Sequence, residues 1–146
     1  MEIDVRLATA PDRTLIEEFY VREGLNFQQL VAASTPVGVS IETMYVVAAT
    51  RGMVIAVLKL DIAKDPALGK VGFIKHFEIE DDFESTDIGS QMLEKASEIA
   101  EEKGLRALDA IFDISRTDLI ELYSASEFKE ERKEIVLRKD FGLRVF

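Results

Sequence analysis

Cysteine and tryptophan are absent from this 146-residue chain, and histidine occurs once. Without cysteine there is no disulfide, no thiolate metal site and no cysteine nucleophile. One histidine, His76, excludes zinc sites built from several histidines. No apolar run is long enough to cross a bilayer, and the first residues lack the basic and apolar regions of a signal peptide. These absences predict a cytoplasmic protein with no membrane contact and no metal site.

Positive charge is also scarce. The chain has 28 acidic and 18 basic residues, which gives a formal net charge of −10. Most of the excess follows Lys70, where nineteen acids accompany eleven bases. A basic footprint for nucleic acid is therefore absent, and we expect no nucleic-acid partner. Two interpretations of the acids stay open: a surface that only keeps the protein soluble, or one that attracts a cationic substrate or partner.

The chain does contain enough apolar material for one folded domain. Hydrophobic residues make up 47% of the sequence, which is typical of globular proteins. A length of 146 residues is close to the usual size of a single domain. No internal repeat or Pro/Gly-rich linker divides the sequence, so we expect one domain over residues 1–146.

Apolar periodicity predicts the order of strands and helices. Alternating apolar residues predict strands, and apolar residues three and four positions apart predict helices. The strand–helix–strand unit over 71–112 is expected to be a parallel crossover in an otherwise largely antiparallel sheet. The expected strands are 2–8, 70–80 and 105–114, with hairpins over 44–62, turning at Arg51-Gly52, and over 128–141. The expected helices are 9–25, 26–34, 88–103 and 116–126.

Two stretches in the second half carry a motif. The first, FEIEDDFESTDIGSQML at residues 77–93, has Ile88-Gly89-Ser90 at the start of a helix, followed by the aliphatic pair Met92-Leu93. The second, RTDLIELYSASEF at residues 116–128, has Leu122-Tyr123 and ends in an aromatic residue. With the element order, these residues resemble the GNAT family of acyl-CoA-dependent N-acetyltransferases. The resemblance covers essentially the whole chain.

The resemblance implies both a fold and a co-substrate. The fold class is α/β (α+β): a GNAT-like mixed, mostly antiparallel sheet of about seven strands flanked by about four helices. The co-substrate is acetyl-CoA, and the acceptor is an amine of a small molecule or a peptide. The sequence departs from the family's motifs at four positions, where Arg or Gln, Gly, Asn and Gly are usual: Glu84, Asp87, Arg116 and Glu127.

In this family the pyrophosphate of CoA rests on backbone N–H groups at a helix N-terminus, where the helix itself supplies no acceptors. Carried over to this chain, the cofactor-binding residues are Phe77, Ile79, Ser85, Thr86, Asp87, Ile88, Gly89 and Ser90.

Six carboxylates and no basic residue lie between Glu78 and Asp87, an unusual setting for a phosphate. One alternative is that Asp87, or a neighbouring hydroxyl, only caps the helix and takes the same N–H groups. Another is a divalent cation held by Asp81, Asp82 and Glu84.

Tyr123 is the candidate acid, because the Tyr at this motif position in the family can protonate the leaving thiolate. The alternative is a core tyrosine beside Leu119 and Ile120. Glu78 and His76 are the candidate bases. Both fall on the strand face opposite the expected core-facing set of Phe73, Lys75, Phe77 and Ile79.

Two functions therefore remain open. One is an N-acetyltransferase that uses acetyl-CoA and an amine acceptor, with Tyr123 and Glu78 as catalytic residues. The other is an inactive GNAT-fold protein that binds or regulates a partner, with a homodimer through the hairpin surfaces as one assembly. The sequence does not indicate the acceptor.

Overall fold

A computed structural model describes residues 2–24, 40–84 and 86–142. The helix expected over 26–34 lies outside the described residues. No described helix is both long and apolar enough to cross a membrane. In chain order the elements are β1 (Asp4–Leu7), α1 (Asp12–Arg22), β2 (Ser40–Thr50), β3 (Met53–Asp65), β4 (Gly69–Ile79), the 3-10 helix η1 (Asp81–Phe83), α3 (Ile88–Glu102), β5 (Ala107–Ala110) and α4 (Thr117–Ala125).

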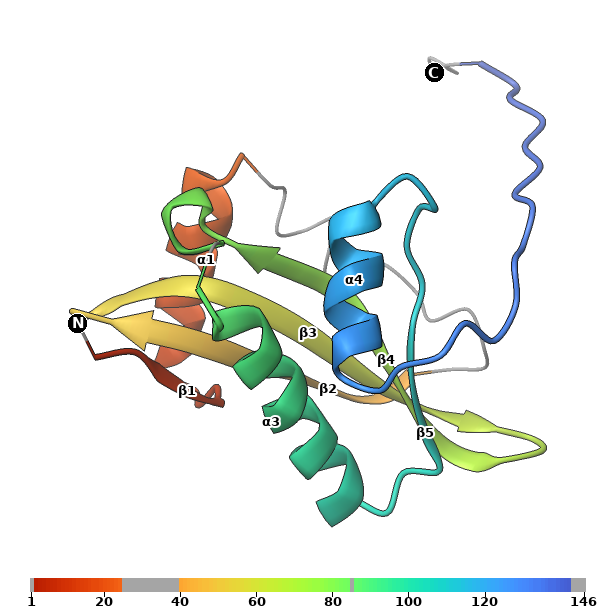
Figure 1. Ribbon diagram of the computed structural model, residues 1–146, viewed down its shortest axis with the longest axis horizontal. Helices are drawn as coiled ribbons and strands as arrows, with labels where there is room; N and C mark the ends of the chain where they lie inside the picture. Colours follow the sequence, from red (N-terminus) through yellow and green to blue (C-terminus); the bar gives the residue numbers. More distant parts are fainter. Residues whose placement is uncertain (1, 25–39, 85, 143–146) are drawn as a thin grey trace, which may run out of the picture.

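One mixed sheet organises the molecule (Figure 1), with the strands in the order β1-β2-β3-β4-β5. Neighbouring strands are antiparallel except β4 and β5, which run parallel and are joined through α3. The expected crossover and the mixed α+β fold class are confirmed. The described residues form five strands and three α-helices, fewer than the seven and four expected.

Short turns fix the register of the antiparallel strands. Arg51 and Gly52 both have positive φ, +51° and +73°, and Thr50 pairs directly with Met53. A two-residue turn of this hand matches the twist of the strands it connects, so the hairpin predicted at this dipeptide is confirmed. At the next turn the carboxylate of Asp65 accepts the backbone N–H of Ala67 at 2.7 Å.

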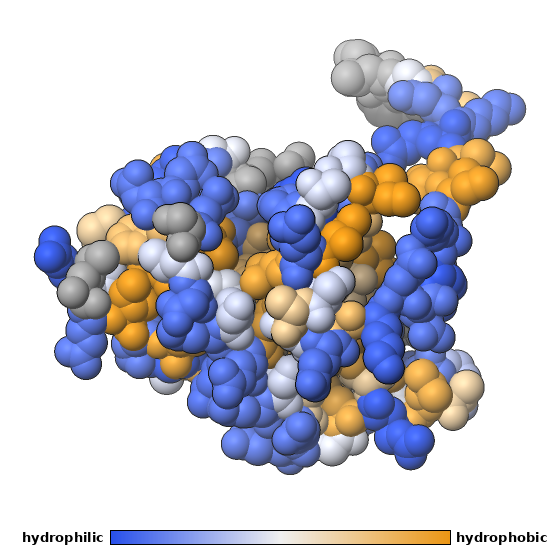
Figure 2. Space-filling model, viewed as in Figure 1, coloured by the Kyte–Doolittle hydropathy of each residue, from blue (hydrophilic) through white to orange (hydrophobic). Residues whose placement is uncertain are grey.

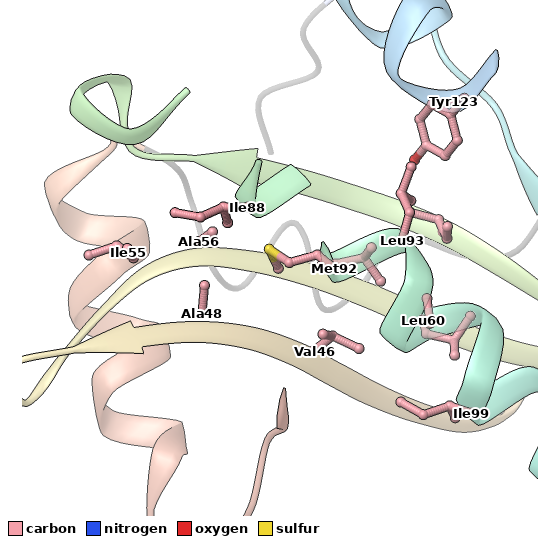
Figure 3. Close-up of a cluster of buried hydrophobic side chains, with 13 residues drawn as sticks. Val46, Ala48, Ile55, Ala56, Leu60, Ile88, Met92, Leu93, Ile99 and Tyr123 are labelled. Carbon is pink, nitrogen blue, oxygen red and sulfur yellow. The ribbon is translucent and has the colours of Figure 1, made fainter. Parts of the chain in front are cut away.

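Helices cover both faces of the sheet. On one face the buried stripe of α3 packs on β2, β3 and β4 (Figure 3), and the cluster includes Val46, Ala48, Leu58, Leu60, Ile74, Ile88, Met92, Leu93, Ala96 and Ile99. On the other face α1 packs through Ile16, Phe19 and Tyr20 onto Val47, Val54 and Val57. The spacing of apolar residues in α1 and in α3 therefore predicts the buried face of each helix correctly.

An ion pair ties β1 to the start of α1. The carboxylate of Asp12 is 4% exposed, pairs with Arg6, and accepts the backbone N–H of Thr9 at 2.8 Å. The hydrogen bond from Arg6, with smaller help from Thr9, lowers the pKa of Asp12 to about 2. Because this carboxylate has both an ion-pair partner and a backbone hydrogen-bond donor, its burial is compatible with a stable fold.

The hairpin predicted over 128–141 is wrong. Residues 129–142, called the C-terminal arm below, form no strand, and every one of them is exposed. Figure 1 shows the arm passing β5 and standing off the body. The β-branched residues of this stretch favour an extended backbone. A strand also needs a partner edge to pair with, and β-branched residues alone do not supply one.

Candidate functional site

The parallel strands β4 and β5 stay together over only four residues. Their pairing runs from Val71 opposite Ala107 to Ile74 opposite Ala110. Beyond this point β4 continues to Ile79, and no strand in the described part of the chain pairs with that edge of it. Figure 1 shows the chain after β5 turning away toward α4. The sheet therefore opens between the two strands.

A β-bulge marks the point of separation. Lys59 pairs with His76 and Leu60 with Ile74, so Lys75 is an extra residue on β4. A bulge re-aims the side chains that follow it. Phe77 and Ile79 pack on the α3 face, whereas Phe73 packs on the other face beside Ala107. The prediction that Phe73 and Lys75 share the face of Phe77 and Ile79 is therefore wrong.

The backbone of β4 presents donors along this edge that no described strand pairs with. The N–H of Glu80 donates to the carbonyl of Ile55 on β3 at 2.9 Å. Successive residues of a strand alternate between the two edges. The N–H groups of Phe77 and Ile79 accordingly face away from β3, toward the opening. An extended ligand containing amide groups could pair with them as a strand would.

The N-terminus of α3 lies next to this edge. The Thr86 hydroxyl donates to the carbonyl of Phe83 at 2.6 Å and accepts the N–H of Ile88 at 3.4 Å. Asp87 occupies the N-cap position, yet its exposed carboxylate makes no capping hydrogen bond. The interpretation that the Asp87 carboxylate occupies the helix N–H groups is therefore wrong.

Two N–H groups of the first turn of α3 have no acceptor among the described residues. The first backbone bond of the helix joins the N–H of Gln91 to the carbonyl of Asp87 at 3.1 Å. No acceptor from the described residues reaches the N–H of Gly89 or Ser90. Ser85, the remaining residue of the predicted cradle, lies outside the described part of the chain. Free N–H groups at this end of a helix favour an anion.

Gly89 has a packing role as well. A Cβ built at this position would lie 3.1 Å from Cδ2 of Leu122 in α4 and 3.4 Å from Cδ1 of Ile79 in β4. Such contacts are tighter than side chains normally tolerate. The absence of a side chain at Gly89 thus allows α3 to sit close to α4, and the aliphatic residue of the Leu122-Tyr123 motif is its direct neighbour.

The ring of Tyr123 packs against other aromatic rings. It is 5% exposed, and its ring stacks on Phe112 with centroids 5.3 Å apart and meets Phe77 edge-on at 6.3 Å. Burial raises the pKa of its hydroxyl well above 10. Figure 3 shows the hydroxyl directed away from α4, toward the sheet and α3. Ile120, expected to be buried beside it, is 39% exposed.

The hydroxyl of Tyr123 is a hydrogen-bond donor that has no acceptor among the described residues. No hydrogen bond joins it to another of the described residues, although the ring is firmly held. A phenol that stays protonated at neutral pH can give a proton to a stronger base nearby. The two interpretations of Tyr123 from the sequence, core residue and acid, are compatible in this arrangement.

Glu78 lies on the opposite face of β4 from Tyr123. It pairs with Val57 of β3, which packs against α1, so its side chain lies on the α1 side of the sheet. Burial raises the pKa of Glu78, while Arg116 opposes the shift. His76 is half-buried on the same strand face. A carboxylate with a raised pKa is a better proton acceptor than an exposed one.

Further carboxylates gather around Glu78. Asp81, Asp82 and Glu84 are exposed, and Glu80 is half-buried. At the end of α1, burial together with Asp81, Glu80 and Glu84 raises the pKa of Glu23. Among the described residues no three His, Asp or Glu side chains are arranged to hold a metal ion. The described residues at this end of the molecule therefore form an anionic surface in which no group of carboxylates is arranged around a cation.

Arg116 is the one cation of the α4 N-terminus, and it is engaged. Its guanidinium pairs with Asp118 at 3.1 Å, a neighbour on α4 and not a member of the run of carboxylates between Glu78 and Asp87. Arg22 approaches the carboxylate of Glu80 at 3.9 Å. Neither contact neutralises the carboxylates of Asp81, Asp82 and Glu84.

Comparison with solved structures identifies the fold. The aminoglycoside N-acetyltransferase AAC(6')-Iy in complex with CoA superimposes with a TM-score of 0.72 at 16% identity, over 94% of this chain and 99% of the other. The chain has the GNAT fold. A ribosomal-protein-alanine N-acetyltransferase from Brucella melitensis biovar Abortus 2308 superimposes on this GNAT-fold chain with a TM-score of 0.73 at 14% identity, over 95% of this chain and all of the other.

A third solved structure that superimposes on this chain is named for a different function. It is a transcriptional regulator from Bacillus halodurans C-125, with a TM-score of 0.70 and 17% identity over 94% of this chain and 100% of the other. No protein-family profile and no curated protein sequence matches the chain. At these identities the likeness establishes the fold, and the function has to be argued from the site.

Proposed function

We propose that this GNAT-fold protein is an N-acetyltransferase that transfers the acetyl group of acetyl-CoA to a primary amine. The observation that carries the proposal is the open edge of β4 beyond the Lys75 bulge. The N-terminus of α3 adjoins this edge, with Tyr123 on one face of the strand and Glu78 on the other. Binding groups and proton-transfer groups thus converge on one opening.

The available donors fit acetyl-CoA. The N–H groups of Phe77 and Ile79 would pair with amide groups of its extended arm, as an added strand does. The N–H groups of Gly89 and Ser90 would bind its pyrophosphate. Backbone donors do not depend on side-chain identity, and the exposed carboxylates of Asp87 and Glu84 are able to turn to solvent. AAC(6')-Iy, which shares the fold, was crystallised with CoA.

Acetyl-CoA supplies a thioester carbonyl as the acyl donor. The acceptor amine attacks this carbonyl, so that a C–N bond forms and the C–S bond breaks. Glu78 is proposed to receive the ammonium proton of the acceptor, and Tyr123 is proposed to protonate the departing thiolate. Backbone N–H groups of β4 near the bulge would polarise the carbonyl.

The acceptor is proposed to be a small molecule or a peptide that carries further positive charge. Glu23, Glu80, Asp81 and Glu84 lie around Glu78, and their potential would attract a cation to this side of the sheet. Several fold neighbours are named as aminoglycoside acetyltransferases, among them AAC(6')-Iy. A polyamine-like or basic peptide acceptor satisfies the same charge requirement.

Calorimetry with acetyl-CoA and two variants of Ser90 tests the proposal. Ser90→Pro removes a backbone N–H that no described residue accepts, and proline is tolerated in the first helical turn. We expect micromolar binding to the wild type, unchanged binding to Ser90→Ala, and at least about fivefold weaker binding to Ser90→Pro, since about 1 kcal/mol is worth fivefold. Equal loss in both variants would implicate the hydroxyl instead of the N–H.

A non-catalytic GNAT-fold binding protein is the second candidate, favoured by the acidic side chains beside the α3 N-terminus. If neither the wild type nor the double variant Asp87→Gly/Glu84→Arg binds acetyl-CoA, the cradle is not functional. The enzyme proposal then fails, and the anionic surface around Glu78 becomes a partner site.

A further inference from the structure

A buried ion pair lies on the α1 face of the central strand β3. Lys59 and Asp61 are each 2% exposed, and the Lys59 ammonium is 3.9 Å from the Asp61 carboxylate. Both residues follow Val57, which packs against α1, at the two-residue spacing of one strand face. Apolar residues in place of such a pair often make a protein more stable. Stability alone therefore does not explain the pair.

The bulge in β4 adds a second lysine to this face. Two residues of a bulged strand oppose one residue of its partner, so Lys75 and His76 both lie opposite Lys59. Lys75 is half-buried. Burial lowers the pKa of Lys75, the charge of Asp61 opposes this shift, and the charge of Lys59 adds to it. Lys59, Asp61 and Lys75 thus form one group, called the lysine cluster below.

Both oxygens of the Asp61 carboxylate already have a partner. Oδ1 accepts the hydroxyl of Thr43 at 2.6 Å, and Oδ2 is the atom that approaches the ammonium of Lys59. Lys75 therefore brings a second positive charge to a single, engaged carboxylate. Residues 25–39, outside the described part of the chain, contain neither an acid nor a base, so they leave this charge balance unchanged. The lysine cluster is positive, and an anion would neutralise it.

Lys75 is the member of the cluster that can reach a ligand. It is half-buried, whereas Lys59 is enclosed, and it lies at the bulge where β4 and β5 separate. An ammonium has three donors, so Lys75 can hold an anion and still contact other parts of the chain. A carboxylate is a suitable anion, because its hydrogen bond from an ammonium is assisted by charge.

Glu78 lies on the same face of β4 as Lys75, in different electrostatic surroundings. Three positions separate the two residues, at most about 10 Å along a strand at roughly 3.3 Å per residue. Beyond Glu78 the surface is acidic, and the charge of Asp81 acts on Glu23 at the end of α1. Figure 2 shows hydrophilic residues over η1 and this end of α1. The face is therefore positive at the bulge and negative beyond Glu78.

We propose that the acceptor is an amino carboxylate, whose carboxylate binds the ammonium of Lys75 while its amine, several bonds away, reaches Glu78. The inference rests on the proposed function, because it assigns the second substrate of that reaction. The spacing favours a side-chain amine, as in lysine or ornithine, over an α-amine on the carbon next to the carboxylate. The α-ammonium of such a diamino acid also supplies the further positive charge that the acidic side chains attract.

Matched acceptors test the inference with the complete protein and acetyl-CoA. L-lysine, lysinamide and cadaverine carry the same side-chain amine, and only L-lysine has a carboxylate. We expect kcat/KM for L-lysine to exceed that of the other two by at least about tenfold, the worth of one charge-assisted hydrogen bond, with the acetyl group on the side-chain amine. Equal values for the three amines would overturn the inference and leave acetyl transfer itself established.

Variants of Lys75 assign the preference to one side chain. Lys75→Met removes the charge and keeps an unbranched stem, so the preference for L-lysine over cadaverine should disappear, chiefly through a higher KM for L-lysine. Lys75→Glu should reverse the preference. Lys70→Met is the matched control, because Lys70 is an exposed lysine of the same strand, and it should keep the wild-type preference. Equal losses in Lys70→Met and Lys75→Met would contradict a carboxylate site at Lys75.

Calorimetry with L-lysine and L-ornithine separates this inference from the proposed reaction, because it needs no turnover. We expect the wild type and Lys70→Met to bind one of these probes, and Lys75→Met to bind it at least about tenfold more weakly. This result together with no binding of acetyl-CoA would end the proposed reaction and keep the carboxylate site. Absence of binding of both probes to the wild type, with and without CoA present, overturns the inference.

Discussion

Tyr123 and Phe128 are joined twice at the end of α4. Their rings meet edge to face with centroids 5.0 Å apart, and the backbone N–H of Phe128 donates to the carbonyl of Tyr123 at 3.0 Å. The turn between them places Glu127 at φ +69°. A left-handed residue just after a helix is the usual way to satisfy its last carbonyls. Here it also sets Phe128 against the phenol ring.

The strain at Glu127 leads to a stability prediction. A residue other than glycine in this region costs about 1–2 kcal/mol, and glycine gives back part of that through its greater freedom in the unfolded chain. Glu127→Gly should therefore stabilise the protein by about 1 kcal/mol in urea unfolding. Glu127→Ala, which keeps a Cβ, should change stability by less than about 0.5 kcal/mol. Equal effects of the two changes would mean that the side chain, not the backbone, matters.

Removing the Tyr123 hydroxyl should affect turnover more than binding or stability. Tyr123→Phe keeps the stacked ring, and the hydroxyl makes no hydrogen bond to another described residue. We expect kcat to fall about 10²-fold, a typical value for a general acid, with the KM for acetyl-CoA within about twofold because the hydroxyl acts in the transition state. Steady-state kinetics with a responsive amine measures both. Unchanged turnover would leave Tyr123 as a packing residue only.

Glu78 provides a pH-dependent test. Burial raises the pKa of its carboxyl in the folded protein above 4.5, the ordinary value. The folded state then binds the proton more tightly than the unfolded state, so ionisation of Glu78 reduces stability as pH rises from below 4.5 through the raised pKa. Glu78→Gln should be as stable as the wild type near pH 4 and more stable at pH 7.

The same Glu78→Gln variant should lose about 10²-fold in kcat/KM, as expected when a general base is removed. Denaturation at both pH values and amine kinetics are the two measurements. Glu94→Gln, on the exposed face of α3, is the control and should keep its turnover. A variant that gains stability at pH 7 and retains full activity would show that Glu78 is buried for another reason.

Asp87 can be changed at little cost to α3. Its carboxylate makes no capping bond, so Asp87→Asn should alter stability by less than about 0.5 kcal/mol. Loss of one negative charge beside the free N–H groups should tighten acetyl-CoA binding severalfold, since about 1 kcal/mol corresponds to fivefold. Calorimetry on the two proteins is the measurement. A large loss of stability with no gain in affinity would restore the view of Asp87 as a cap.

Salt should strengthen the binding of acetyl-CoA. Asp81, Asp82, Glu84 and Asp87 lie near the α3 N-terminus, and no basic residue occurs between positions 78 and 87. Repulsion of the phosphates is screened as ionic strength rises. Titrations at low and moderate salt should show tighter binding at the higher concentration, with a smaller change in Asp87→Asn. Tighter binding at low salt would contradict this account. It would indicate that the phosphates are attracted by positive charges that the described residues do not place near the α3 N-terminus.

Local patterns predicted the parts of the fold that depend on neighbouring residues. The stripe of α3 and the turn at Arg51-Gly52 follow from spacing and from the backbone freedom of glycine, and both are confirmed. The N–H groups near Gly89 that no described residue accepts also follow from the helix start, whereas their use as a phosphate cradle stays a prediction. In each case the decisive interactions lie within a few positions along the chain.

Two features could not be predicted because they depend on distant contacts. The bulge at Lys75 changes the faces of β4, and its trace in the sequence is the odd spacing between Ile74 and Phe77, which pack on the same face. The arm around Leu137 has the composition of a strand, yet pairing also needs a partner edge, which the composition of the arm does not specify. A pattern specifies the tendency to extend, not the partner.

The connections of the sheet carry a consequence for the order of folding. β2, β3 and β4 are joined by short turns and pair with their neighbours in sequence, so little chain entropy is lost in bringing them together. β5 reaches β4 only across the whole of α3. We expect the three-stranded meander to form early and the β4–β5 opening to form late, so the proposed acyl-transfer site would be assembled by the last contacts to form.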